Sequence, residues 1–167
     1  NWWVAELAAV DLSSGQLRRI AKPERQLNFP RSAPDGKSVA YVLTDRELHL
    51  VTLGAGGTDR TLFTGAIATD GREGPRPTWS PDGQYVAFPL RDARSFVNVH
   101  VVPAAGGAAR PVSFLGNGEM GGIAWSPDGT RIVVGGGVDD VVHVFEKGAS
   151  GTFASVGKPI ALGHIKT

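Results

Sequence analysis

The sequence contains no cysteine, which excludes disulfides, thiol catalysis and metal sites built from thiolates. It also has no apolar run near the roughly 18 residues that a membrane-spanning helix requires. Its charges almost cancel, with a formal net charge of +1 at pH 7, and the Lys and Arg residues are scattered along the chain. This balance gives no indication of a nucleic-acid or acidic-lipid partner.

No segment has a clear helical period, whereas residues that form turns are abundant. The 167 residues include 23 glycines and 11 prolines, which favour tight turns over long helices. Apolar residues make up 41% of the chain, as is typical of a soluble domain with a core. The composition therefore predicts one domain built from short strands and turns.

One phrase occurs three times, as "RSAPDGKSVAYV" (31–42), "TWSPDGQYVAFP" (78–89) and "AWSPDGTRIVVG" (124–135). Each copy has a Pro-Asp-Gly turn followed by an alternating strand, and the turn aspartates are Asp35, Asp82 and Asp128. A repeat of about 40–50 residues is typical of propeller blades. The spacing of the aspartates fits that range.

The rest of each unit repeats as well. A third strand is expected in "ELHLVTL", "NVHVVPA" and "VVHVFEK", and a fourth in "RTLFT", "RPVSFL" and "KPIAL". The stretch "ELAAVDLSSGQLRRIA" (6–21) has only the third and fourth strands. We therefore predict an all-β fold, a partial β-propeller of about three and a half four-stranded antiparallel blades. The expected boundaries are a half-blade at 1–22 and blades at about 26–64, 75–115 and 121–163.

The repeated "WSPDG", followed by "HVVPAAGGAARPVSF" (100–114), resembles the PD40 (WD40-like) propeller repeat over almost the whole chain. This family includes TolB-like propellers and the non-catalytic propellers of prolyl-oligopeptidase-type and tricorn-type peptidases. The resemblance implies a propeller fold, because the motif is structural. One copy departs from it, since Ser32 and Ala33 stand where the other copies have Trp and Ser. We expect poorer packing at that point of the first blade.

The recurring side chains have structural interpretations. Pro and Gly suit the φ angles of a type I turn with a bulged hairpin, and Asp fits between them. Trp79 and Trp125 are expected to fill the space between blades. The alternative interpretation is that they form a stacking platform for a ligand. Three histidines recur at one repeat position: His49, His100 and His143. They are too far apart in a propeller to share a metal ion, so we expect them to pack between blades.

Catalytic and cofactor motifs are missing. The chain has no G-x-S-x-G elbow, no H-E-x-x-H and no Asp-rich calcium loop. The stretch "GTFASVGKP" (151–159) lacks the spacing of a phosphate loop, and "GNGEMG" (116–121) precedes a strand where a dinucleotide site needs a helix. We therefore expect no catalytic residue, no cofactor and no metal in this chain.

Function is expected in the loops between the second and third strands and between blades, which are longer and more varied than the other turns. The candidate binding surface on these loops is Asp70, Arg72, Glu73, Arg91, Asp92, Arg94, Glu119, Met120, Asp139 and Asp140. Its mixed charge suits a protein or peptide partner, and solvated loops without a partner are the alternative interpretation.

Three and a half blades leave strand edges unpaired, which favours pairing with other strands. We expect further blades of a longer protein, or self-association, to cover these edges. The functional prediction is a non-catalytic scaffold that binds protein or peptide partners, without nucleic acid and without membrane insertion. The alternative is a propeller fragment that controls substrate entry in a serine peptidase. A third interpretation is a sugar- or small-molecule lectin, but no aromatic cluster in the long loops favours it.

Overall fold

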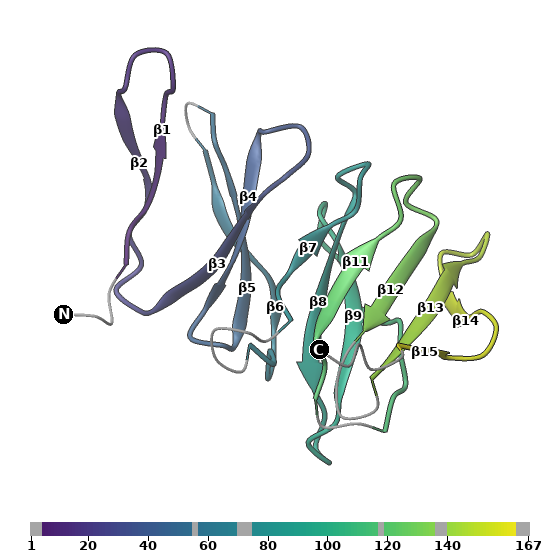
Figure 1. Cartoon of the computed structure of the whole chain (residues 1–167). Helices are drawn as coiled ribbons and strands as arrows, with labels where there is room; N and C mark the ends of the chain where they lie inside the picture. The colour runs from purple at the N-terminus through teal and green to yellow at the C-terminus, as the bar shows by residue number, and fades with distance from the viewer. Residues whose placement is uncertain (1–4, 55–56, 70–74, 117–118, 136–139, 163–167) are drawn as a thin grey trace, which may run out of the picture.

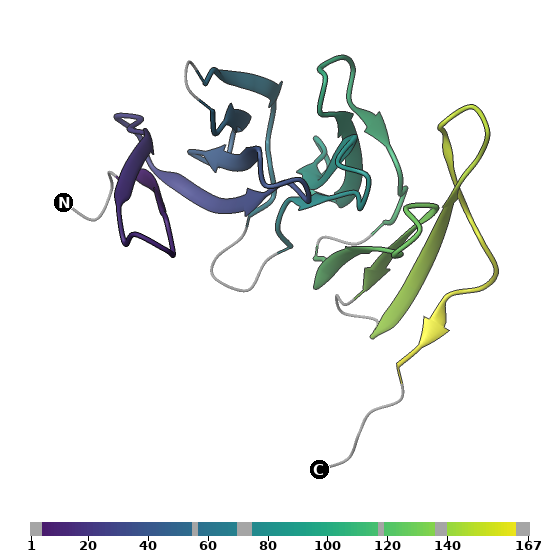
Figure 2. The ribbon, with the colours of Figure 1, turned by 90° about the horizontal axis from the view of Figure 1, so that it is seen from above.

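The computed structural model describes residues 5–54, 57–69, 75–116, 119–135 and 140–162, and these residues form strands and turns without any helix. The strands lie in four antiparallel sheets that stand side by side along an arc, with the first and last sheets at its two ends (Figures 1 and 2). This arrangement is an incomplete β-propeller, as the repeat predicts.

The strands follow the chain order within each sheet. The first sheet pairs β1 (Leu7–Val10) with β2 (Leu17–Ala21). The second contains β3 (Leu27–Ser32), β4 (Ser38–Leu43), β5 (Glu47–Thr52) and β6 (Asp59–Thr64). The third contains β7 (Thr78–Trp79), β8 (Tyr85–Arg91), β9 (Val97–Pro103) and β10 (Arg110–Pro111). The fourth contains β11 (Gly122–Trp125), β12 (Arg131–Gly135), β13 (Val141–Lys147), β14 (Phe153–Ser155) and β15 (Ile160–Ala161). The last three sheets are called blades 1, 2 and 3 below.

The fourth strand of blade 1 agrees with the prediction, whereas those of blades 2 and 3 differ from it. In blade 2 the stretch "RPVSFL" (110–115) pairs with β9 only at Arg110 and Pro111. In blade 3 the outer position is divided, because β14 pairs with one end of β13 and β15 with the other. The prediction for blade 3 located β15 and missed β14. Outer strands have a neighbour on one side only, so their pattern specifies their length weakly.

The core fills the seams between consecutive sheets. One cluster joins the β1–β2 hairpin to blade 1, a second joins blade 1 to blade 2, and a third joins blade 2 to blade 3. Successive residues of β4 alternate between two seams, since Val39 packs toward the hairpin and Ala40 toward blade 2. The inner blades are thus buried on both faces, which explains their nearly continuous apolar strands.

The three Pro-Asp-Gly turns have the same geometry at the same end of the molecule. Gly36, Gly83 and Gly129 have φ angles of 68°, 69° and 70°, and each amide donates to a carbonyl three residues earlier at 2.9 Å. Only glycine adopts this left-handed conformation without strain. The turns also lie close to one another, because a Cβ added to Gly83 would lie 3.8 Å from Pro34 Cδ and one added to Gly129 would lie 3.7 Å from Pro81 Cδ.

The tryptophans link each blade to the one before it. Trp79 Nε1 donates to the carbonyl of Arg31 at 2.9 Å, and Trp125 Nε1 donates to that of Thr78 at 3.4 Å. Arg31 and Thr78 occupy the same repeat position in successive blades. Both rings are half-buried and pack against the core of the seam they face. Ser32, at the equivalent position of blade 1, is exposed.

Arginines of the outer strands make a second repeated link, in the opposite direction. Arg18 donates to the carbonyl of Leu53, and Arg60 donates to that of Ala104. Leu53 and Ala104 stand at one repeat position, just after the third strand. The hairpin strand β2 thus makes the contact with blade 1 that β6 makes with blade 2.

A candidate binding pocket at the end of blade 2

The candidate surface from the sequence divides into three parts. Asp70, Arg72, Glu73 and Asp139 lie outside the residues that the structure describes. The structure corrects the prediction that Met120 belongs to the binding surface, because its side chain is only 7% exposed and packs in the seam between blades 2 and 3. Arg91 is the last residue of β8 at the end opposite the Pro-Asp-Gly turns, and Asp92, Arg94, Glu119 and Asp140 lie on the loops at that end (Figure 1).

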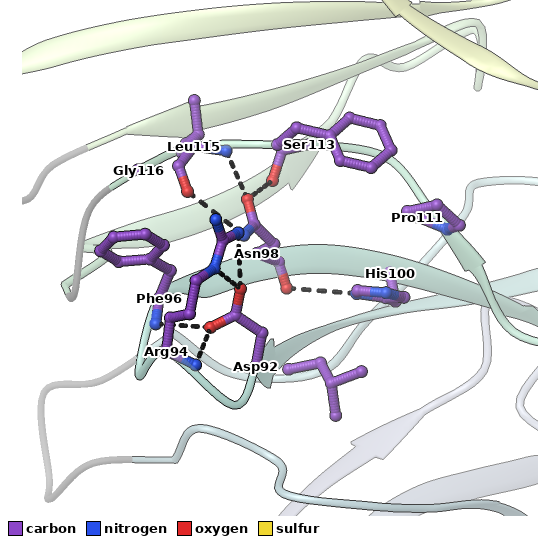
Figure 3. Close-up of a pocket in the computed structure, with 11 residues that line it drawn as sticks. Asp92, Arg94, Phe96, Asn98, His100, Pro111, Ser113, Leu115 and Gly116 are labelled. Carbon is purple, nitrogen blue, oxygen red and sulfur yellow. Dashed lines mark hydrogen bonds and ion pairs between the residues drawn. The ribbon is translucent and has the colours of Figure 1, made fainter.

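Asp92 and Arg94 meet at a pocket of about 490 Å³ in blade 2. This volume is within the range of small-ligand sites. Loop 92–96 forms one side, the chain after β10 forms the other, and strands β8 and β9 form the base (Figure 3). The lining residues are Leu90, Asp92, Arg94, Phe96, Asn98, His100, Pro111, Ser113, Phe114, Leu115 and Gly116.

The pocket exists because blade 2 departs from the repeat at its outer strand. In blade 1 the strand β6 pairs with β5 from Asp59 to Thr64, but in blade 2 β10 ends after Pro111. Beyond that point the Ser113 hydroxyl accepts a hydrogen bond from the Val99 amide at 2.9 Å. The Val112 and Ser113 amides still donate to the Val99 carbonyl at 2.8 and 3.3 Å. A side chain therefore replaces only the return hydrogen bond of this step, before the chain diverges from β9.

Asn98 fixes the diverging segment. Its side-chain oxygen accepts hydrogen bonds from the Ser113 hydroxyl at 3.0 Å and the Leu115 amide at 2.5 Å, and its nitrogen donates to the Leu115 carbonyl at 3.2 Å. Figure 3 shows Asn98 between these residues and the Asp92–Arg94 pair. Asn98 is only 8% exposed, and every described buried side-chain polar atom has a partner. Such a satisfied polar network holds the wall of the pocket in one geometry.

Loop 92–96 is built around the Asp92 carboxylate. One oxygen accepts the amides of Arg94 at 2.8 Å and Phe96 at 3.0 Å, and the other pairs with Arg94 Nη2 at 3.0 Å. Burial alone would raise the pKa of Asp92, but these hydrogen bonds outweigh it and lower the pKa. The carboxylate therefore stays charged, and Arg94 extends over the Phe96 ring with its guanidinium carbon 4.9 Å from the ring centroid.

His100 lines the pocket from β9, and its ring lies beside that of Phe88, which packs in the seam between blades 1 and 2. Its ring centroid is 6.2 Å from that of Phe88, which is its cross-strand neighbour. Burial lowers the pKa of His100, partly opposed by a hydrogen bond to Asn98, so the ring is neutral at pH 7. Nδ1 lies 3.4 Å from the Asn98 carbonyl, which only accepts, so Nδ1 carries the hydrogen.

His49 has different surroundings in blade 1. Its Nε2 is 3.0 Å from Glu47 and its Nδ1 is 3.1 Å from Asp59, while its ring stacks on Tyr41 at 5.1 Å. Arg25 and, to a lesser degree, His49 lower the pKa of Glu47 to about 2. Among the described residues, no group of three or more His, Cys, Asp or Glu is placed to hold a metal ion.

A family model for the lipoprotein LpqB β-propeller domain matches residues 11–167. The chain belongs to this family. No curated protein matches the chain significantly. In the part that the structure describes, no helix is long and apolar enough to cross a membrane.

Solved structures share the fold of this LpqB-family propeller. TolB from Agrobacterium tumefaciens is 19% identical, with a TM-score of 0.64 over 95% of this chain and 55% of that protein. TolB from Acinetobacter baumannii is 18% identical, with a TM-score of 0.66 over 92% of this chain and 37% of that protein. An oligogalacturonate lyase in complex with manganese is 21% identical, with a TM-score of 0.68 over 93% and 42%. The chain therefore spans roughly half or less of these propellers, and the likeness shows the fold alone.

Proposed function

We propose that this propeller domain is a non-catalytic scaffold that binds a protein or peptide partner. The observation that carries the proposal is the pocket of blade 2, which forms where the outer strand β10 of that blade stops short. Departures of this kind are expected at functional sites, because the rest of the fold offsets their cost. The residues at the same end that would form the surrounding contact surface are Arg91, Asp92, Arg94, Glu119 and Asp140.

The family suggests where the protein would meet such a partner. Its description names a lipoprotein, so we propose that the whole protein is held at a membrane surface by a lipid and presents the propeller to a partner. The alternative is a propeller that controls substrate entry in a serine peptidase. The full-length gene distinguishes the two, because only the alternative requires a catalytic domain in the same protein or complex.

A peptide selection with matched variants tests the proposed surface. Peptides from a random displayed library are selected against the domain, and their affinities are then measured for three variants. Arg94→Glu and Glu119→Lys change the loop end of the propeller, whereas Lys37→Glu changes an exposed residue of a Pro-Asp-Gly turn at the opposite end. We expect the first two to weaken the selected peptides and the third to leave them unchanged. Equal effects at both ends, or no effect of the loop substitutions, would contradict the proposal.

A further inference from the structure

In the blade 2 pocket, most hydrogen-bond acceptors already have partners within the protein, whereas several donors do not. The Asp92 carboxylate already accepts two backbone amides and the Arg94 guanidinium, so little of its capacity remains for a ligand. Arg94 directs Nε and Nη2 toward Asp92, and its side chain is 75% exposed. The guanidinium therefore retains N–H donors on the side away from Asp92.

The deeper polar groups follow the same pattern. Both lone-pair directions of the Asn98 oxygen are used by Ser113 and Leu115, whereas its amide nitrogen uses one of two hydrogens on the Leu115 carbonyl. The Ser113 hydroxyl both donates to Asn98 and accepts from Val99. Apart from His100 Nε2, the groups left for a ligand are thus donors, which match an anion or a carbonyl.

The rest of the lining is apolar. Leu90, Phe96, Pro111 and Leu115 contribute carbon surface, and the neighbouring Phe114 is 81% exposed. A large aromatic side chain beside a pocket gains favourable burial when a ligand covers it.

From this geometry we infer that the pocket binds a peptide carboxylate that is adjacent to an aromatic or large aliphatic side chain. The carboxylate pairs with the free edge of the Arg94 guanidinium and with the Asn98 amide, and the side chain packs against Phe114, Leu90 and Pro111. This inference rests on the proposed function, since it names the chemistry that the scaffold recognises. A chain terminus and a Glu or Asp side chain are two sources of the same carboxylate.

Three short probes distinguish these sources by NMR titration of the 167-residue domain. N-acetyl-Gly-Phe has a terminal carboxylate, N-acetyl-Glu-Phe-amide has a side-chain carboxylate, and N-acetyl-Gly-Phe-amide has none. We expect at least one carboxylate probe to shift the amides of Phe96, Asn98 and Leu115, and to bind about tenfold more tightly than the uncharged amide, because ionic hydrogen bonds are the stronger ones. Equal binding of all three probes would overturn the inference.

Two variants and one control locate the contact. Arg94→Gln should weaken the carboxylate probe about tenfold and leave the uncharged probe unchanged, whereas Phe114→Ala should weaken both. Arg46→Gln is the control, because Arg46 is an exposed arginine on the corresponding loop of blade 1. Phe114 is exposed, so its removal does not endanger folding.

The outcomes separate this inference from the proposed function. If carboxylate probes bind equally well to the wild type and to Arg94→Gln, or shift residues outside the pocket, the inference is wrong. Peptides selected in the preceding experiment could still depend on Glu119, and the scaffold proposal would then stand. If neither the probes nor the selected peptides respond to the loop residues, both are wrong.

Discussion

At the scale of single residues, the hydroxyl next to the Pro-Asp-Gly turn distinguishes the three copies. Ser80 and Ser126 each donate to the turn aspartate at 2.5 Å and accept a backbone amide at 2.9 Å. In blade 1 this position is Ala33, although the backbone hydrogen bonds of the turn are the same. One turn therefore lacks a pair of hydrogen bonds for which its geometry is ready.

Ala33→Ser should stabilise the domain and Ser126→Ala should destabilise it, each by about 1 kcal/mol, the usual net value of a hydrogen bond. Urea unfolding of the two variants measures both changes. A stabilised Ser126→Ala variant, or a destabilised Ala33→Ser variant, would show that the hydroxyl does not support the turn.

Ser126→Ala should also change how the stability of the domain depends on pH. The Ser126 hydroxyl, followed by the Thr130 amide, lowers the pKa of Asp128 to about 2. A carboxylate with a lowered folded-state pKa contributes stability that is present above about pH 4 and is lost as the pH falls toward 2. In Ser126→Ala the pKa of Asp128 should rise, and a carboxyl NMR titration of the variant shows whether it does.

At the scale of elements, the sequence predicted what is local or repeated. The turns needed only Pro, Asp and Gly in order, and the strands after them needed only alternation, so both were found. Met120 is a surface candidate in the sequence because it lies in a long loop between blades, yet its side chain packs in the seam, and a lone apolar side chain in a glycine-rich loop is itself a sign of burial. The pocket was missed because it depends on where β10 stops, which Asn98 and Ser113 decide through contacts 15 residues apart.

Trp125 tests the link between neighbouring blades. Its Nε1 donates across the seam to Thr78, and its ring meets Phe153 edge-on at 5.9 Å. Trp125→Ala should cost about 3 kcal/mol, the lower end for a large core aromatic, because the ring is half-buried. Trp125→Phe keeps the ring contact and should cost less. Denaturant unfolding measures both, and a cost below about 1 kcal/mol for Trp125→Ala would show that the seam does not depend on it.

At the scale of the whole molecule, the two end sheets expose apolar residues. Val10, Leu12 and Leu17 are 54%, 97% and 67% exposed on the hairpin, and Ile160 and Leu162 are 56% and 52% exposed on blade 3. The inner blades bury their apolar faces against neighbours, so the end sheets are the places where another strand layer would be favourable.

The 167-residue domain should therefore associate in solution. Multi-angle light scattering at increasing concentration should show dimers or a heterogeneous population, and Leu12→Ser with Ile160→Ser should shift the population toward monomer. Arg46→Ser, on an exposed loop of an inner blade, is the control. A compact monomer at every concentration would contradict the prediction.

The repeated hydrogen bonds between blades require a particular side chain in only one of the two blades. Trp79, Trp125, Arg18 and Arg60 all donate across a seam to backbone carbonyls, which every amino acid possesses. A blade must therefore keep its own donors, but it does not require a particular side chain at the receiving positions of its neighbour. These hydrogen bonds would therefore survive the duplication, exchange or insertion of a blade without matched side-chain changes at the carbonyls that accept them, and only the apolar packing of the seam would have to adapt.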